Sequence, residues 1–74
     1  MNDFRLLGSV KSVEEGTLTL ETESGAFKMT YNESLKKSLE NVKANDKILI
    51  QGKLEASKGI KLVAEKMIGY KRGA

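Results

Sequence analysis

The stretch DKILIQGKLEASKGIKLVAEKMIGY, residues 46–70, decides the fold that the sequence predicts. Apolar and polar residues alternate on both sides of a short segment, 55–59, that ends in glycine. This pattern is typical of two strands joined by a hairpin loop. Gly52 permits curvature in the first strand and Gly59 permits the turn, so we interpret the stretch as the closing hairpin of a small β-barrel. The residues expected to close that barrel are Ile48, Ile50, Leu54, Ile60, Leu62 and Ala64.

Three further strands are expected ahead of this hairpin, at residues 4–13, 17–23 and 26–31. In these segments apolar side chains recur at alternate positions, which is the period of a strand with one buried face. In the first segment Leu7 breaks the alternation next to Gly8, and this indicates a bulge or a bend. Such a bend would let one strand serve both halves of a barrel.

A short helix is expected between the third strand and the hairpin. Asn32 is a suitable N-cap, and Leu35, Leu39 and Val42 follow at spacings of four and three, which places them on one apolar stripe. Because a helix this short is marginal by itself, the stripe must dock on an apolar surface. The open end of the barrel is the place we expect it to cover.

The resulting order of strand, strand, strand, helix, strand, strand is that of the OB-fold, a five-stranded, partly open Greek-key barrel. We therefore predict a mainly β protein with one OB-fold domain over residues 1–74 and a loose tail at about 70–74. A hydrophobic core of this size supplies only about 3–5 kcal/mol. Barrel closure and self-association, as a dimer or tetramer, are the expected additional sources of stability.

The composition bounds the possible partners and location. Lys and Arg number 13 against 10 acidic residues, so the net charge of +3 permits an anionic partner without requiring one. The sequence has no cysteine and no histidine, so neither a disulfide nor a usual zinc site is expected. No apolar run reaches the ~20 residues of a membrane span, and the first residues lack a signal-peptide pattern. We expect a cytoplasmic protein without cofactors.

Enzymatic functions are not indicated by any residue pattern. Without histidine or cysteine, the usual general bases and thiol nucleophiles are missing. The adjacent acids Glu14 and Glu15 belong to an expected turn, whereas general acid–base catalysis needs groups that converge on a substrate. Residues 52–59 lack the Gly-Lys-Ser/Thr ending of a phosphate-binding loop. We expect a non-catalytic protein without a small-molecule substrate.

Three segments carry a family resemblance: FRLLGSV at 4–10, NDKILIQGKL at 45–54 and IKLVAEKM at 60–67. Together they resemble the first and the last two strands of bacterial single-stranded-DNA-binding proteins. The shared features are apolar alternation, a glycine followed by a basic and an aliphatic residue, and a Val-Ala-acid ending. The resemblance implies an OB-fold that binds single-stranded nucleic acid, with DNA favoured over RNA, and that forms homo-oligomers.

The chain also departs from cellular members of that family. Its 74 residues include no long flexible tail, no acidic tip and no tryptophan. A minimal version of the kind carried by mobile elements, or a relative of the primosomal replication OB-proteins, is therefore the better resemblance. With so few aromatic residues, base stacking must depend on a small number of side chains.

A sequence-tolerant single-strand binder needs basic side chains along the phosphates and aromatic faces against the bases. In OB-folds the usual platform is strands two and three with the loops between strands one and two and strands four and five. Lysines around the expected hairpin glycine favour that loop, whereas Glu14, Glu15, Glu21 and Glu23 would repel phosphate if they faced the platform. The candidate nucleic-acid-binding residues are Arg5, Lys11, Lys28, Thr30, Tyr31, Lys53, Lys58, Lys61, Tyr70, Lys71 and Arg72.

Two functional alternatives stay open at this point. The lysines are either phosphate contacts or an ordinary solvated surface, and Phe27 and Tyr31 are either core or stacking residues. The second functional hypothesis is an OB-fold that acts as a protein-interaction or assembly module. Its candidate interface residues are Leu7, Leu49 and Val63, which fall outside the core alternation.

Overall fold

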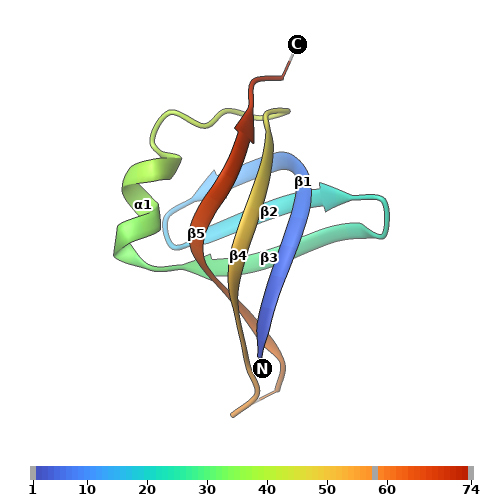
Figure 1. Cartoon of the computed structure of the whole chain (residues 1–74), viewed down its shortest axis with the longest axis vertical. Helices are drawn as coiled ribbons and strands as arrows, with labels where there is room; N and C mark the ends of the chain where they lie inside the picture. Colours follow the sequence, from blue (N-terminus) through green and yellow to red (C-terminus); the bar gives the residue numbers. More distant parts are fainter. Residues whose placement is uncertain (1, 58, 74) are drawn as a thin grey trace.

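The computed structural model describes residues 2–57 and 59–73, and within them five strands form a closed barrel in the order β1-β2-β3-β5-β4 (Figure 1). The predicted OB-fold architecture is confirmed, because one short helix lies between the third and fourth strands. The elements are β1 (Asp3–Glu14), β2 (Thr17–Thr22), β3 (Gly25–Tyr31), α1 (Glu33–Leu39), β4 (Lys47–Glu55) and β5 (Lys61–Lys71).

The long first strand serves both halves of the barrel, as its sequence predicted. Its first part pairs with β4 and its second part pairs with β2, both antiparallel, and the two ladders meet at Ser9. The register with β2 shifts between Val10 and Ser12, so the irregularity lies just after the position expected near Gly8. A bulge of this kind increases the local twist and bends the strand from one sheet into the other.

The barrel closes through a short parallel contact. β5 pairs antiparallel with β4 along most of its length, but with β3 it shares only the pairs Thr30–Val63 and Tyr31–Ala64. The Asn32 N–H continues this contact by donating to the Ala64 carbonyl at 3.4 Å. On the other side of β5, Ala64 lies opposite Gly52. Small residues at both positions allow the strands to approach closely.

The helix covers the barrel with Leu35 and Leu39, as predicted, but it ends at Leu39, so Val42, which was expected on the same helical stripe, lies beyond it. The Asn32 side chain accepts a hydrogen bond from the Leu35 N–H at 2.9 Å, which caps the helix N-terminus. Leu35 and Leu39 are buried and join the barrel core, while Val42 packs against that core. Figure 1 shows α1 beside β5, with which it makes contact. The buried core consists of Val10, Leu18, Leu20, Met29, Leu35, Leu39, Ile48, Ile50 and Ala64.

Two hairpin residues expected in the core are not there. Leu54 is 37% exposed and Ile60 is 83% exposed. The cause is the length of the hairpin: its tip extends past the barrel (Figure 1), and Ile60 precedes the first residue of β5. The same alternation continues into this overhang, where no barrel interior remains to receive the side chains. Leu62, closer to the barrel, is half-buried.

The tail that the sequence predicted as loose at about 70–74 is held in place over its described residues, 70–73, while Ala74 lies outside the described residues. β5 continues to Lys71, and the buried Asp46 carboxylate holds the segment that follows. Asp46 accepts hydrogen bonds from the Gly73 N–H at 2.8 Å, the Lys43 N–H at 2.9 Å and the Tyr70 hydroxyl at 2.9 Å. One carboxylate thus joins the end of the chain to the loop that leads into β4.

We predict that Gly52→Ala lowers the free energy of unfolding by about 1–3 kcal/mol, the usual cost of overpacking. A methyl group at this position would collide with the Val63 carbonyl oxygen and lie 2.9 Å from the Ala64 Cα atom. Because both are main-chain atoms, the strands must move apart. Urea unfolding followed by circular dichroism measures the change, with the neighbouring exposed variant Lys53→Ala as control. Equal stability of the two variants would contradict this prediction.

A second prediction concerns acid stability. The N–H groups of Gly73 and Lys43 hold the pKa of Asp46 below its usual value of 3.8. Because the pKa of Asp46 is lower in the folded state, its carboxylate stabilises the fold above pH 3.8. This stability is lost as the pH falls through the pKa of the folded state. We expect Asp46→Asn to lower the melting temperature at pH 7 and to flatten its decline below about pH 4. Melting temperatures measured from pH 2 to pH 7 test this, with the exposed variant Asp3→Asn as the matched control. The same dependence of melting temperature on pH in the wild-type chain, Asp46→Asn and Asp3→Asn would refute the prediction.

Candidate nucleic-acid interface

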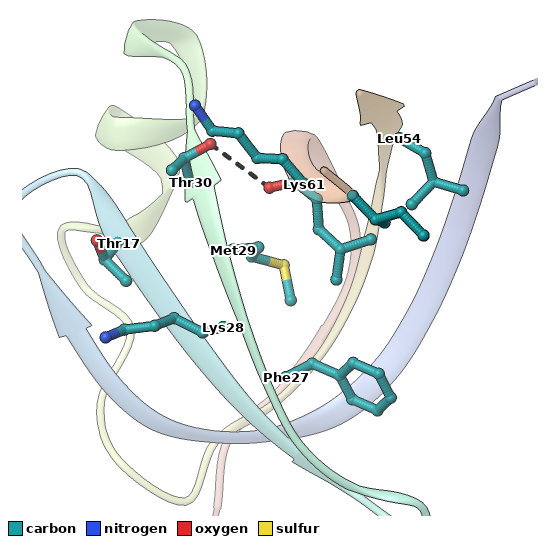
Figure 2. A pocket seen from close by; sticks show the side chains of 9 residues that line it. Thr17, Phe27, Lys28, Met29, Thr30, Leu54 and Lys61 are labelled. Atoms are coloured by element: carbon teal, nitrogen blue, oxygen red, sulfur yellow. Dashed lines mark hydrogen bonds between the residues drawn. The ribbon is translucent and has the colours of Figure 1, made fainter. Parts of the chain in front are cut away.

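A groove lies between β3 and the β4–β5 hairpin, with a volume of about 680 Å³ (Figure 2). We call it the hairpin groove. β2 and β3 supply one wall, and the overhanging part of the hairpin supplies the other. The residues that line it are Thr17, Phe27, Lys28, Met29, Thr30, Leu54, Ile60, Lys61 and Leu62.

The charge of the hairpin groove is positive. Its described lining residues include the exposed cations Lys28 and Lys61 and no carboxylate. Figure 2 shows the Lys61 side chain extending toward Thr30, while Lys28 and Phe27 leave β3 on opposite sides. The Thr30 hydroxyl donates to the Leu62 carbonyl at 3.4 Å, which ties the two walls together beside the point of barrel closure. Of the residues predicted from sequence, this groove brings together Lys28, Thr30 and Lys61.

The groove also has an apolar lining. Phe27 is half-buried and packs against the core, yet it also lines the groove. Leu54 and Ile60, which the sequence placed in the core, are instead exposed lining residues. Sequence reasoning missed them as site residues because their alternation continues that of the buried strand positions. One aromatic side chain and two exposed aliphatic side chains therefore line the same groove as the two cations.

The four acidic residues expected to repel phosphate do not line this groove. Glu21 and Glu23 line a separate depression with Leu7 and Lys47. The turn acids, Glu14 and Glu15, line another depression with the α1 residue Lys36. None of the four lines the groove, but Glu21 lies opposite Ala26 on the same outward side of the β2–β3 ladder as Lys28, which lies opposite Thr19.

Tyr31 has a local structural role. Its hydroxyl donates to the Glu14 carbonyl at 2.8 Å and accepts from the Gly16 N–H at 3.1 Å. Both partners belong to the turn between β1 and β2, so the phenol holds that turn against the end of β3. Tyr31 is half-buried, packs against the core and lies outside the hairpin groove.

The other predicted binding residues are spread over the molecule. Arg5, Lys53 and Lys71 occupy outward positions on the sheet formed by β1, β4 and β5. Lys11 is exposed at the bulge of β1. Lys58 lies outside the described residues.

Tyr70 and Arg72 belong to the cluster around Asp46. Tyr70 donates its hydroxyl to the Asp46 carboxylate, and this hydrogen bond raises the pKa of the phenol. Arg72 lines the same small depression as these two residues. The cluster is therefore a mixed-charge site that secures the chain end, and it does not continue the hairpin groove.

The predicted interface residues occupy the outer side of the sheet. Leu7 lies opposite Leu49 in the β1–β4 register, and Leu7 is 64% exposed. Val63 is half-buried and lies opposite Lys53, separated from the two leucines by the row that contains Gln51. The structure therefore brings two of the three residues side by side.

No group of three or more His, Cys, Asp or Glu residues in the described ranges could hold a metal ion. Within the same ranges, no helix is long and apolar enough to cross a membrane. Comparisons of the chain with protein-family models, curated proteins and solved structures return no match.

We predict that Tyr31→Phe lowers the free energy of unfolding by about 0.5–1.5 kcal/mol, the net contribution of a typical hydrogen bond. The ring would keep its packing, but the Glu14 carbonyl and the Gly16 N–H would lose their shared partner. Urea unfolding gives the change. Hydrogen exchange of the Gly16 amide gives a second measurement, with Phe27→Leu, which leaves this turn intact, as the reference. Only Tyr31→Phe should speed that exchange. Unaltered exchange at Gly16 in Tyr31→Phe would contradict the role of the hydroxyl.

Proposed function

We propose that this protein is a non-catalytic, sequence-tolerant binder of single-stranded nucleic acid, with DNA favoured over RNA. The observation that carries the proposal is the hairpin groove, in which Phe27 and two aliphatic side chains lie with Lys28 and Lys61 and without a carboxylate. Such a groove combines the two requirements of single-strand binding, a cationic path for phosphates and apolar faces for bases.

The position of the groove within the fold supports this function. OB-folds bind oligonucleotides with the face of strands two and three and with the loops between strands one and two and between strands four and five. Here β3 and the β4–β5 hairpin form the two walls. The resemblance of the first and last strands to bacterial single-stranded-DNA-binding proteins points to the same ligand and to DNA rather than RNA.

Different residues of the groove contact the phosphates and the bases. Lys28 and Lys61 are exposed and contact phosphates, whereas Phe27 stacks against one base and Leu54 and Ile60 contact its neighbours. A base–aromatic stack contributes about 1–3 kcal/mol. With a single aromatic residue in the groove, the affinity is modest and depends strongly on salt, because the release of counterions supplies most of it.

The direct test is fluorescence anisotropy with labelled oligo-dT and with a duplex of equal length, at low and at moderate salt. We expect the single strand to bind more tightly than the duplex, because the bases of a duplex are stacked within the helix and cannot reach Phe27. Equal affinity for both, or no binding at low salt, would overturn the proposal. An RNA oligomer of the same sequence measures the preference for DNA.

Variants of the groove should weaken oligo-dT binding in different ways. Phe27→Leu keeps an apolar side chain but removes the aromatic face, so affinity falls by about five-fold or more, equivalent to at least about 1 kcal/mol of stacking. Lys28→Gln and Lys61→Gln each remove one phosphate contact and reduce the slope of log K against log salt by about 0.7. Lys37→Gln on α1 removes the same charge away from the groove and serves as the control. An equal loss in the control and the groove variants would place the binding elsewhere.

A further inference from the structure

A second surface is independent of the hairpin groove. It is the outward side of the sheet formed by β1, β4 and β5, and we call it the outer sheet face. The Arg5 Nε–H donates to the Gln51 Oε1 atom at 3.2 Å, so paired residues on neighbouring strands meet on this side. Short of the overhanging pair Glu55–Lys61, which continues the same side of the ladder, its registered positions are Asp3, Arg5, Leu7, Ser9, Lys47, Leu49, Gln51, Lys53, Val63, Lys66, Gly69 and Lys71.

The positive excess of the whole chain is concentrated on this face. Of the 13 basic and 10 acidic residues, the registered positions hold five basic residues and one acidic residue. The remainder of the chain therefore carries eight basic and nine acidic residues. Glu65, half-buried in the bulge beside Lys66, adjoins the face, and Glu21 and Glu23 border it beyond β1. The basic residues are Arg5, Lys47, Lys53, Lys66 and Lys71.

The centre of the outer sheet face is apolar. Leu7 is 64% exposed and pairs with Leu49, and Leu49 in turn lies opposite Gly69. A methyl group at Gly69 would lie 3.2 Å from the Leu49 Cβ atom, so the glycine leaves room into which Leu49 leans. The exposed Leu7 therefore lies beside Leu49 and borders a depression that it shares with Lys47, Glu21 and Glu23.

Two classes of partner fit this face poorly. Single-stranded nucleic acid gains much of its affinity from aromatic stacking, and the registered positions include no aromatic residue. A second copy that used the same face would bring the five basic residues of each copy together, and like charges across an interface are strongly unfavourable. The face fits a partner that supplies both negative charge and an apolar side chain.

We infer that the outer sheet face binds an acidic segment of another protein. An apolar side chain of that segment packs against Leu7 and Leu49, and its carboxylates pair with Lys47 and Lys71, which lie opposite each other in the β4–β5 register. The segment extends from the leucine pair toward β5, because Glu21 and Glu23 repel it on the other side of β1. Binding there leaves the hairpin groove free for nucleic acid.

The experiment uses the full chain and a labelled synthetic peptide in which Asp and Glu alternate with Leu. Anisotropy at low salt should show binding, which Leu7→Ser and the double variant Lys47→Gln/Lys71→Gln each weaken by about five-fold or more. Lys37→Gln on α1 and Lys28→Gln in the hairpin groove should retain the wild-type affinity for the peptide. Peptides with Asn and Gln in place of the acids, or Ser in place of Leu, should bind more weakly. Melting curves establish that each variant is folded.

Four results of the binding experiments would overturn the inference. They are no peptide binding by the wild-type chain, equal binding of the uncharged peptide, equal loss in the α1 control, and loss of oligo-dT affinity in the outer-face variants. The last would make the face a nucleic-acid surface. Light scattering adds a separate check, since a wild-type dimer that Leu7→Ser dissociates would show that a second copy occupies the face. Failure of oligo-dT to bind would refute the proposed function and leave the peptide result intact.

Discussion

The barrel depends on a parallel contact of two residue pairs, Thr30–Val63 and Tyr31–Ala64. Every other strand pair is antiparallel and extends over more residues, so this is the shortest ladder in the described barrel. Parallel pairing is slightly less stable per residue than antiparallel pairing. The contact persists because Ala64 is fully buried and fits against Gly52, where a larger side chain would separate the strands.

The same short contact creates the candidate site. Beyond Thr30, toward the start of β3, no ladder to β5 continues, and the overhanging hairpin faces β3 across the groove. A longer ladder would pair these strands and leave no space between them. Barrel closure and ligand access therefore have one structural origin: the walls are held together at Thr30 and are free to diverge where Phe27 and Lys28 lie.

The charges of the chain are modest in sum but separated in space. Two lysines lie in the hairpin groove, acids gather at the turns of the first three strands, and the outer sheet face holds most of the local positive excess. A net charge of +3 by itself says nothing about this arrangement. The separation matters because fields around a folded protein follow the local charge pattern, so different surfaces attract different anionic partners.

Local sequence patterns predicted the elements well because their causes are local. Alternation placed Leu18, Leu20, Ile48 and Ile50 inside, and all four are buried. The N-cap at Asn32 also follows from chemistry within one turn of helix. These features depend on neighbours three residues away or on a strict two-residue period, both of which can be read along the chain.

Only the tertiary structure determines where the alternating pattern extends past the barrel core. Ile60 and Leu62 share the same parity, yet the barrel reaches only Leu62, so the exposed Ile60 became part of the groove. The order of the chain end likewise came from Asp46, which lies far from Gly73 in sequence and accepts its N–H after the fold forms. The sequence by itself determined the elements and their inward faces, through short-range periodicity and capping. The extent of the barrel, the groove and the separation of charges were decided by contacts between segments distant in the chain.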